Sequence, residues 1–359
     1  MVDTLSPQPR KGRGAVSNSS GRFEAESRHA VDDGWTVSDE DLPPLRTTVT
    51  DENPKTIISR NASPDVPFDR SINAYRGCEH GCVYCFARPT HAYHGLSPGL
   101  DFETKLFAKP QAAALLAVEL AKPRYQCQPL AMGTNTDPYQ PIERSRRITR
   151  QILEVLAEHD HPVTIVTKSD LVCRDIDILA PMAARGLASV ALSVTTLDGA
   201  LARRLEPRAA SPAKRLAAIR ALAEAGVPTA IMVAPVIPAL TDPEIESILA
   251  AGKDAGAGLA EYILLRLPLE IADLFDEWLR QHAPMKAEHV LSLIRDSRGG
   301  GLYQSDWGRR RTGSGAYAEL LAKRFALARK RLGLDARGLD LRTDLFRPPP
   351  RPGDQLALF

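Results

Sequence analysis

Hydrophobic positions between residues 71 and 295 alternate between short apolar runs and longer stretches with helical spacing. The short runs predict strands at 71–74, 130–133, 163–167, 188–194, 228–233 and 262–265. The longer stretches predict helices over 110–121, 144–159, 176–184, 212–225, 242–255, 274–282 and 287–295. Strands that alternate with helices are typical of an α/β fold with a parallel sheet. Six strand–helix repeats favour a partial (β/α)6 TIM barrel, and a doubly wound sheet is the alternative.

The segments on either side of this pattern differ in composition. Residues 1–54 are rich in Ser, Pro, Gly, Asp and Arg and have no sustained apolar period. A disordered or loosely packed N-terminal extension is therefore expected there, followed by a core domain over 55–285. Residues 286–359 predict a helical, basic C-terminal extension with a helix over 316–332.

Basic residues gather in the C-terminal extension, where residues 295–351 hold 14 Lys and Arg against 6 Asp and Glu. Tyr303 and Trp307 lie beside the arginine run 309–311. Arginines among aromatic side chains can bind phosphates and stack on bases, so nucleic acid is a candidate partner. A solvated helix face with a flexible basic loop is the alternative.

The bulk composition is that of a globular protein. The chain has 359 residues, of which 43% are hydrophobic and 25% charged, and its net charge of +2 does not indicate nucleic-acid binding. No apolar run reaches the roughly 18 residues of a membrane span. The first twenty residues are polar, so a cytoplasmic protein is expected. The oligomeric state is left open, and a monomer is compatible with the sequence.

Three of the five cysteines lie within eight residues, and Cys78, Cys82 and Cys85 have C-x3-C-x2-C spacing. Such a group indicates metal or redox chemistry rather than structural disulfides. Three close thiolates can hold three irons of a cubane cluster and leave the fourth iron open to a substrate or cofactor. Gly77 and Gly81 permit the tight backbone that such a loop requires.

Three other interpretations of these cysteines remain open. A zinc site needs a fourth ligand, and His80, His91 and His94 are the candidates. A cluster that only transfers electrons needs a fourth cysteine, for which Cys127 and Cys173 are available. The third interpretation is a chance grouping of free thiols.

The cysteine motif, with Tyr84 before its last cysteine and its place after the first strand, resembles the radical S-adenosylmethionine (SAM) superfamily. The resemblance implies a partial barrel of the radical SAM type and a 4Fe-4S cluster on Cys78, Cys82 and Cys85. It also implies SAM at the open iron, reductive cleavage to a 5′-deoxyadenosyl radical, and an electron donor such as flavodoxin or ferredoxin. A cluster- or zinc-containing nucleic-acid-binding or redox-sensing protein without SAM turnover is the alternative function.

Three further segments, MGTNTDPYQPIE (132–143), RLEPR (204–208) and APVIPALTD (234–242), are similar to the spore photoproduct lyase-like group, often labelled DNA repair photolyase-like. Spore photoproduct lyase itself has a hydrogen-donating cysteine where this chain has Thr134, and Cys127 lies several residues earlier. The resemblance therefore extends to SAM cleavage and a lyase-like enzyme, and leaves open the substrate, the hydrogen donor and whether SAM is regenerated.

Ligands of parallel α/β folds gather at the carboxyl ends of the strands. The resemblance places the SAM amino group at 134–137 and its adenine near Ala234 and Leu265. At the end of the third strand the cation of Lys168 can meet the SAM carboxylate, and at the end of the fourth strand Ser193 and Thr195 can bond the ribose hydroxyls. The cofactor-binding candidates are thus Tyr84, Thr134, Asn135, Thr136, Asp137, Lys168, Ser193, Thr195, Ala234 and Leu265. Turn formation, solvent exposure or core packing are the alternative roles. Glu206 and Arg208 are expected to form a charged pair around Pro207, which orients a substrate or braces the loop.

Overall fold

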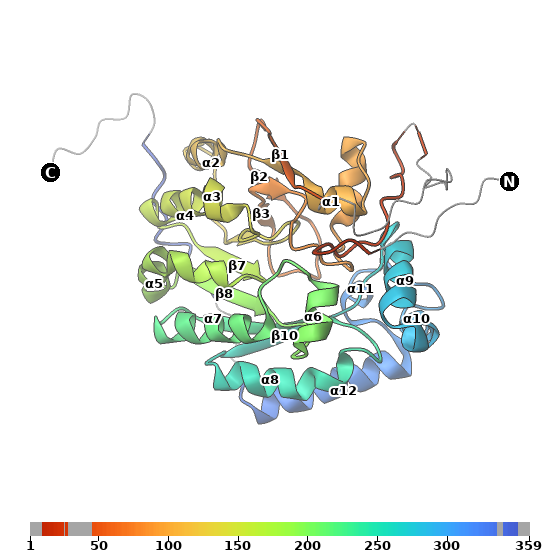
Figure 1. The fold of residues 1–359 in the computed structure, drawn as a ribbon. Helices are drawn as coiled ribbons and strands as arrows, with labels where there is room; N and C mark the ends of the chain where they lie inside the picture. The colour runs from red at the N-terminus through yellow and green to blue at the C-terminus, as the bar shows by residue number, and fades with distance from the viewer. Residues whose placement is uncertain (1–8, 25, 28–44, 336–339, 351–359) are drawn as a thin grey trace.

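A seven-stranded sheet forms the centre of the computed structural model, which describes residues 9–24, 26–27, 45–335 and 340–350 (Figure 1). The strand order is β10-β9-β8-β7-β6-β3-β2. In this sheet the six strands β3, β6, β7, β8, β9 and β10 are parallel to one another. Strand β2 pairs antiparallel with β3 at one edge. Their bounds are β2 (Ile58–Arg60), β3 (Arg70–Ile72), β6 (Leu130–Met132), β7 (Val163–Thr167), β8 (Ala188–Ser193), β9 (Thr229–Val236) and β10 (Leu259–Leu264). The predicted α/β fold with a partial barrel of six parallel strands is confirmed.

Helices follow the strands as the apolar spacing predicts. In the order of the chain they are α2 (Ala112–Leu120), α3 (Glu143–Arg146), α4 (Ile148–Glu158), α5 (Ile176–Ala184), α6 (Gly199–Leu205), α7 (Pro212–Glu224), α8 (Ile245–Asp254), α9 (Ile271–His282), α10 (Ala287–Asp296), α11 (Arg309–Thr312) and α12 (Gly315–Arg331). Figure 1 shows α5, α7 and α8 along the sheet, with α12 against α8. The apolar faces of these helices and the buried side chains of the sheet make up the main core.

Local chemistry explains where several helices begin and end. The Ser211 hydroxyl accepts a hydrogen bond from the Lys214 amide, and Pro212 occupies the first turn of α7. The predicted helix 144–159 is divided, because Arg147 has φ 52° and separates α3 from α4. Gly252 lets α8 approach β9, since a Cβ there would lie 2.5 Å from Ile231 Cδ1.

A second, smaller sheet lies beside the first and was not predicted from the sequence. It has the order β1-β5-β4, with β1 (Thr48–Asp51) parallel to β5 (Lys105–Ala108) and β4 (Tyr75–Arg76) antiparallel to it. The short helix α1 (Leu100–Thr104) leads directly into β5. The cysteine segment begins directly after β4, so this sheet anchors one end of it.

Parts of the N-terminal extension pack against the domain. Residues 13–17 are buried, so the expected loose attachment is wrong for this stretch. Figure 1 shows the red N-terminal trace beside α1. Residues 28–44, which belong to the same predicted extension, lie outside the described residues. No helix in the described part of the chain is long and apolar enough to cross a membrane.

The loop between β2 and β3 is connected to the C-terminal extension through hydrogen bonds of Asp65. Asp65, in the loop between β2 and β3, accepts hydrogen bonds from Arg310 Nε at 2.7 Å and Nη2 at 2.5 Å. The Asp65 carbonyl accepts a further bond from Arg311 Nη1 at 2.5 Å. The arginine run that the sequence marks as a phosphate-binding candidate therefore attaches the C-terminal extension to the β2–β3 loop.

Candidate cluster and cofactor site

The three cysteines lie on one tight loop, residues 77–87, at the carboxyl end of the barrel. Gly77 and Gly81 have φ 72° and 67°, a backbone conformation that favours glycine. A Cβ on Gly77 would lie 2.8 Å from the Phe102 carbonyl oxygen, so the loop also needs the missing side chain for space. The Cys78 amide donates to that same carbonyl at 3.0 Å. The sequence-based role of both glycines is confirmed by this geometry.

The three cysteines lie near one another on this loop. Cys78 and Cys82 are buried, Cys85 is partly buried, and all three are free of disulfides. Burial raises the pKa of Cys78, and the nearby charges of Asp137, Cys82 and Cys85 raise it further. In the described chain no group of three His, Cys, Asp or Glu side chains is arranged to hold one metal ion. Three thiols on one loop instead fit the donor set of an iron–sulfur cluster with one open iron.

The histidines considered as a fourth zinc ligand have other contacts. His80 Nδ1 lies 3.3 Å from Asp137 Oδ2. His91 Nε2 is hydrogen-bonded to the Lys105 carbonyl at 2.9 Å, and His94 stacks on the Phe107 ring at 4.7 Å. These contacts give each imidazole a structural role.

The two remaining cysteines lie apart from the loop in the topology. Cys127 precedes β6 and so lies at the amino end of the barrel strands, opposite the cysteine loop. Cys173 belongs to the 3-10 helix η3 (Asp170–Asp175), and its sulfur faces the Ala218 carbonyl at 4.0 Å. Both residues are half-buried, and this placement does not favour either of them as a fourth cluster ligand.

Asp137 joins the cysteine loop to β7. Its carboxylate accepts hydrogen bonds from the Thr167 hydroxyl at 2.7 Å and the Lys168 amide at 2.8 Å, and it faces His80. Burial alone would raise the pKa of Asp137, but the His80 charge and these hydrogen bonds hold it at about 2. Both carboxylate oxygens are thus engaged within the protein, and Asp137 acts as an anchor of the site.

The neighbouring residues of the 134–137 segment also contact the loop backbone. The Thr136 hydroxyl donates to the Gly77 carbonyl at 2.8 Å. Gln140 completes the contact, because its Oε1 accepts the Glu79 amide at 2.9 Å and its Nε2 donates to Gly77 O at 3.3 Å. Sequence reasoning missed Gln140, although it lies in the same 132–143 segment.

Asn73 is a second residue that the sequence did not reveal. It follows β3, and its amide nitrogen lies 3.2 Å from the Thr134 hydroxyl. Its side-chain oxygen accepts the Asn135 backbone amide at 3.0 Å. The Asn135 side chain is exposed at this edge of the barrel. Asn73 therefore sets the position of Thr134 and Asn135 relative to the first strand.

Residues from the ends of three strands, from the loop after α6 and from the cysteine loop converge around Tyr84. Its hydroxyl contacts the Glu206 carboxylate and lies 3.2 Å from the Thr195 hydroxyl. Thr195 also contacts Glu206 at 2.7 Å and the Ala234 carbonyl at 3.2 Å. Lys168 Nζ donates to the same carbonyl at 3.4 Å and lies 5.8 Å from the centre of the Tyr84 ring. Tyr84, Lys168, Thr195 and Ala234, all predicted from the sequence, are thus brought together.

The expected pair of Glu206 and Arg208 is wrong. Glu206 forms a buried ion pair with Arg215 of α7, whereas Arg208 Nη2 lies 3.1 Å from Glu79 Oε1 on the cysteine loop. Arg215 also donates to the Ser193 carbonyl at 2.9 Å, which ties the end of β8 into the same network. The pairing follows from the direction of α7, which no local spacing reports.

Leu265 lies just beyond β10 and is buried in an apolar cluster. Its carbonyl accepts a hydrogen bond from Arg298 Nη2 at 2.7 Å. Arg298 also donates to the carbonyls of Arg309 and Arg310, so it supports the backbone of the C-terminal extension. Arg298, although it belongs to the basic segment, therefore binds backbone carbonyls within the protein.

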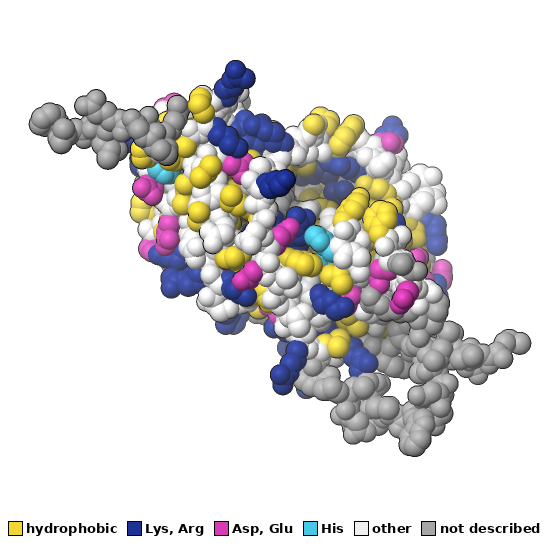
Figure 2. Space-filling model, turned by 90° about the horizontal axis from the view of Figure 1, so that it is seen from above, with side chains coloured by type: hydrophobic (Ala, Val, Ile, Leu, Met, Phe, Trp, Pro, Cys, Tyr) yellow, Lys and Arg dark blue, Asp and Glu magenta, His cyan; other side chains and the backbone are white. Residues whose placement is uncertain are grey.

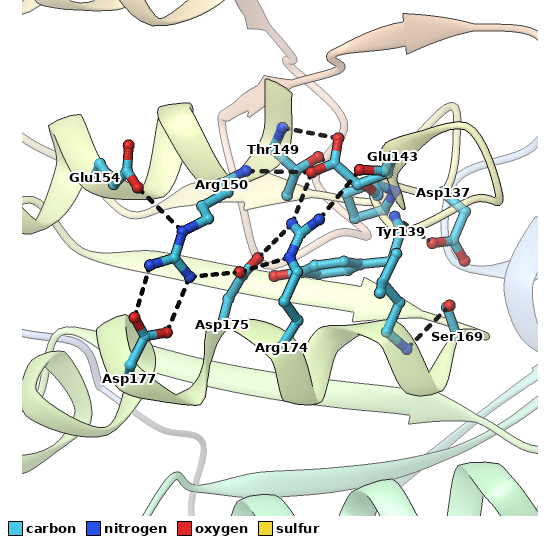
Figure 3. A network of polar contacts seen from close by, with 12 residues as sticks. Asp137, Tyr139, Glu143, Thr149, Arg150, Glu154, Ser169, Arg174, Asp175 and Asp177 are labelled. Carbon is cyan, nitrogen blue, oxygen red and sulfur yellow. Dashed lines mark hydrogen bonds and ion pairs between the residues drawn. The ribbon is translucent and has the colours of Figure 1, made fainter. Parts of the chain in front are cut away.

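A polar network of residues from α3, α4 and η3 supports the 137–143 loop (Figure 3). Glu143 is fully buried and accepts the Thr149 amide at 3.0 Å and Arg174 Nη2 at 2.7 Å. Arg174 and Arg150 both bind Asp175, at 2.8 Å and 2.9 Å. The network links α3, α4 and η3, so the loop that carries Asp137 is held from three elements.

The fold is thus a partial parallel barrel with a three-cysteine loop at its carboxyl end. Residues 72–251 match the sequence profile of the Radical SAM superfamily. The chain belongs to this superfamily and is an enzyme of the radical SAM type. The superfamily implies a 4Fe-4S cluster and SAM as cofactors.

Relatives and solved structures agree with this assignment. An uncharacterized protein of Mycobacterium tuberculosis is 37% identical over 276 residues, covering 76% of this chain and 77% of the relative. An uncharacterized protein of Methanocaldococcus jannaschii is 30% identical over 224 residues, covering 61% of this chain and 78% of the relative.

Two solved structures of spore photoproduct lyase variants are similar to this chain. One has a TM-score of 0.56 at 15% identity and covers 83% of this chain and 87% of that chain. Another, with bound AdoMet and dinucleoside spore photoproduct, has a TM-score of 0.52 at 17% identity and covers 79% and 77%. At these identities the likeness shows a shared fold.

Proposed function

We propose that this chain carries a 4Fe-4S cluster on Cys78, Cys82 and Cys85 and reductively cleaves SAM. The observation that carries the proposal is a buried three-thiol loop beside a converging set of polar residues at the strand ends. When bound, the cluster supplies the electron that splits the SAM sulfonium into methionine and a 5′-deoxyadenosyl radical. The chain's own residues bind and orient SAM and keep water away from it.

The contacts within the site divide the candidate SAM-binding residues into two groups. Thr136, Asp137 and Thr195 already bond to protein groups, so in this proposal they position the loop and the strand ends. Lys168 carries the cation proposed to pair with the SAM carboxylate, and the exposed Asn135 lies with Thr134 at the edge proposed for its amino group. Ser193 is assigned to the ribose, and the segment after Ala234 with Leu265 to the adenine.

A reducing electron donor is part of this proposal, because the cluster must be reduced before each cleavage. Flavodoxin or ferredoxin would serve, and free thiols are compatible with a reducing cytoplasm. For the substrate, nucleic acid is the first class to test, since a fold relative holds a dinucleoside spore photoproduct. The basic extension supports this only weakly, because Arg298, Arg310 and Arg311 are committed to internal contacts. Figure 2 shows Lys and Arg scattered among acidic and apolar side chains on one face.

The deciding experiment is an anaerobic assay. The protein is reconstituted with iron and sulfide, reduced with dithionite, mixed with SAM and assayed for 5′-deoxyadenosine by chromatography. A Cys78, Cys82 and Cys85 triple-Ala variant is run beside it. We expect deoxyadenosine from the wild type alone. A wild type that binds zinc, or a cluster that leaves SAM intact, would support the cluster- or zinc-containing binding or redox-sensing protein instead.

A further inference from the structure

The buried part of the N-terminal extension lies directly on the cysteine loop. The amides of Gly14 and Ala15 donate to the two carboxylate oxygens of Glu103, at 2.9 Å and 2.8 Å. A Cβ built on Gly14 would lie 1.7 Å from the carbonyl oxygen of Gly81, so only glycine allows this approach. Gly81 stands between Cys78 and Cys82, and the extension therefore touches the loop where its cysteines are held.

Arg88 connects Glu103 to the cysteine loop. Both side chains are fully buried, and Arg88 Nη2 lies 2.5 Å from Glu103 Oε1. The same guanidinium donates to the carbonyl of Cys82 at 2.9 Å and to that of Gly81 at 3.2 Å. Because a buried carboxylate needs donors for its oxygens, the Gly14 and Ala15 amides and the Arg88 guanidinium together satisfy Glu103.

A second connection reaches the loop from Arg13. Its Nη1 donates to the Glu103 carbonyl at 2.9 Å, and its Nη2 lies 3.1 Å from the Thr47 hydroxyl. Thr47 in turn donates to Glu79 Oε1 at 2.7 Å, and Glu79 follows Cys78 directly. Val16 packs in the same apolar cluster as Cys82 and Tyr84. Residues 13–17 thus contact the backbone of the loop at Gly81 and pack against its apolar side chains. They also reach Glu79 through Thr47.

We propose that residues 13–17, here called the N-terminal strap, help the cysteine loop to bind and keep the cluster. The strap holds the cysteine loop in the conformation that accepts the cluster and covers the loop backbone around Gly81. It lies outside residues 72–251, which match the superfamily profile. The proposal rests on the proposed function, since it requires that a cluster binds to these cysteines. Gly14, Glu103 and Arg88 are positioning residues in this scheme.

Gly14→Ala is the direct test, with Gly12→Asn as its matched control. A Cβ at Gly12 meets nothing within 4 Å, and asparagine tolerates its φ of 74°. We expect Gly12→Asn to bind wild-type amounts of iron and sulfide after anaerobic reconstitution. We expect Gly14→Ala to lose its cluster in air faster than the wild type, because loss of a group that orients metal ligands weakens metal binding by about 10-fold or more. The visible absorbance of the cluster follows both rates.

Glu103→Gln gives a second test that does not depend on a steric clash. The neutral amide cannot accept both strap amides and balance Arg88, so we expect an altered electron paramagnetic resonance signal and midpoint potential of the reduced cluster. Circular dichroism of the cluster-free variants shows whether they fold. If Gly14→Ala does not fold, Glu103→Gln alone decides.

The two proposals fail in different ways. If the wild type takes up no 4Fe-4S cluster, the proposed function is wrong. If the wild type binds the cluster and cleaves SAM, but folded strap variants keep its cluster content, air stability, spectrum and potential, only the role of the strap is wrong.

Discussion

The hydroxyl of Tyr84 donates a hydrogen bond to the carboxylate of Glu206, although the two residues are 122 positions apart in the chain. The contact joins the segment between Cys82 and Cys85 to the loop that follows α6. Glu206 is also paired with Arg215, and both side chains are only 1% exposed. The position of the aromatic residue in the cysteine motif is therefore set by a buried ion pair between residues far from it in the sequence.

Removal of Glu206 should destabilise the protein strongly. Glu206→Ala leaves Arg215 buried without its partner, which costs about 3–5 kcal/mol in comparable cases. Urea unfolding of the cluster-free protein measures the loss. Glu288→Ala is the matched control, because Glu288 is 71% exposed in its pair with Arg280 and should cost at most about 1 kcal/mol. Similar small losses for both variants would show that the Glu206 pair does not support the fold.

A single cysteine substitution should abolish the cluster. Cys82→Ser removes one of three thiolates, and the hydroxyl that replaces it is a poor ligand for iron in a cluster. Iron and sulfide content and the electron paramagnetic resonance spectrum report the outcome. Cys173→Ser should keep wild-type values. A Cys82→Ser protein with a full 4Fe-4S spectrum would show that the ligands are assigned wrongly.

Loss of the Lys168 charge should weaken SAM binding. If Lys168 pairs with the SAM carboxylate, Lys168→Met removes a charge-assisted hydrogen bond, which contributes about 1.5–3 kcal/mol. That corresponds to a Kd for SAM higher by roughly 10- to 100-fold, measurable by anaerobic calorimetry on the reconstituted protein. Lys214→Met is the control, since Lys214 is 65% exposed and 3.7 Å from Asp170. An unchanged Kd in Lys168→Met would exclude this role.

Stability should fall with acidity because of His161. Burial lowers the pKa of His161 to about 4, with its ring nitrogens bonded to the Tyr125 hydroxyl at 2.7 Å and the Pro162 carbonyl at 3.0 Å. Below its ordinary pKa of 6.5 the unfolded chain binds a proton that the folded chain does not. Stability from this group is thus complete above about pH 6.5 and falls as the pH drops toward about 4.

The expected size of this effect is about 2 kcal/mol between roughly pH 7.5 and pH 5. Other groups titrate in this range too, so the measurement is a difference between wild type and His161→Gln by urea unfolding at both values. Glutamine keeps polar contacts but binds no proton, and its stability should depend less on pH by that amount. Parallel pH profiles for the two proteins would contradict the assignment.

The contact of Asp65 with the arginine run should protect that run from proteolysis. Asp65→Ala removes the acceptor of Arg310, and we expect faster tryptic cleavage between residues 309 and 311. Limited proteolysis with mass spectrometry locates the cut. Asp69→Ala is the control, because Asp69 is 52% exposed and its ion pair in the described part of the chain is with its neighbour Arg70, at 3.3 Å. Equal cleavage in Asp65→Ala and wild type would mean that the contact does not hold the extension.

Much of the architecture is encoded locally. Apolar spacing predicted the six parallel strands and most helices, because a strand or a helix buries one face at a fixed period of the chain. The spacing of Cys78, Cys82 and Cys85 predicted a shared site, because ligands so close in sequence must lie on one loop. The predicted strands 163–167 and 228–233 likewise placed Lys168 and Ala234 at the carboxyl end of the barrel, whereas their contact is known only from the structure.

Only the tertiary structure decided which distant groups meet at the site. The pairing of Glu206 with Arg215 rather than Arg208 depends on how α7 packs, and the contact of Gly14 with Gly81 depends on where a polar segment without apolar period comes to rest. Such contacts join residues far apart in the chain and follow from the packing of whole elements, which leaves no periodic trace in the sequence. The sequence by itself therefore determined the barrel and the three-cysteine loop, and packing determined what holds that loop in place.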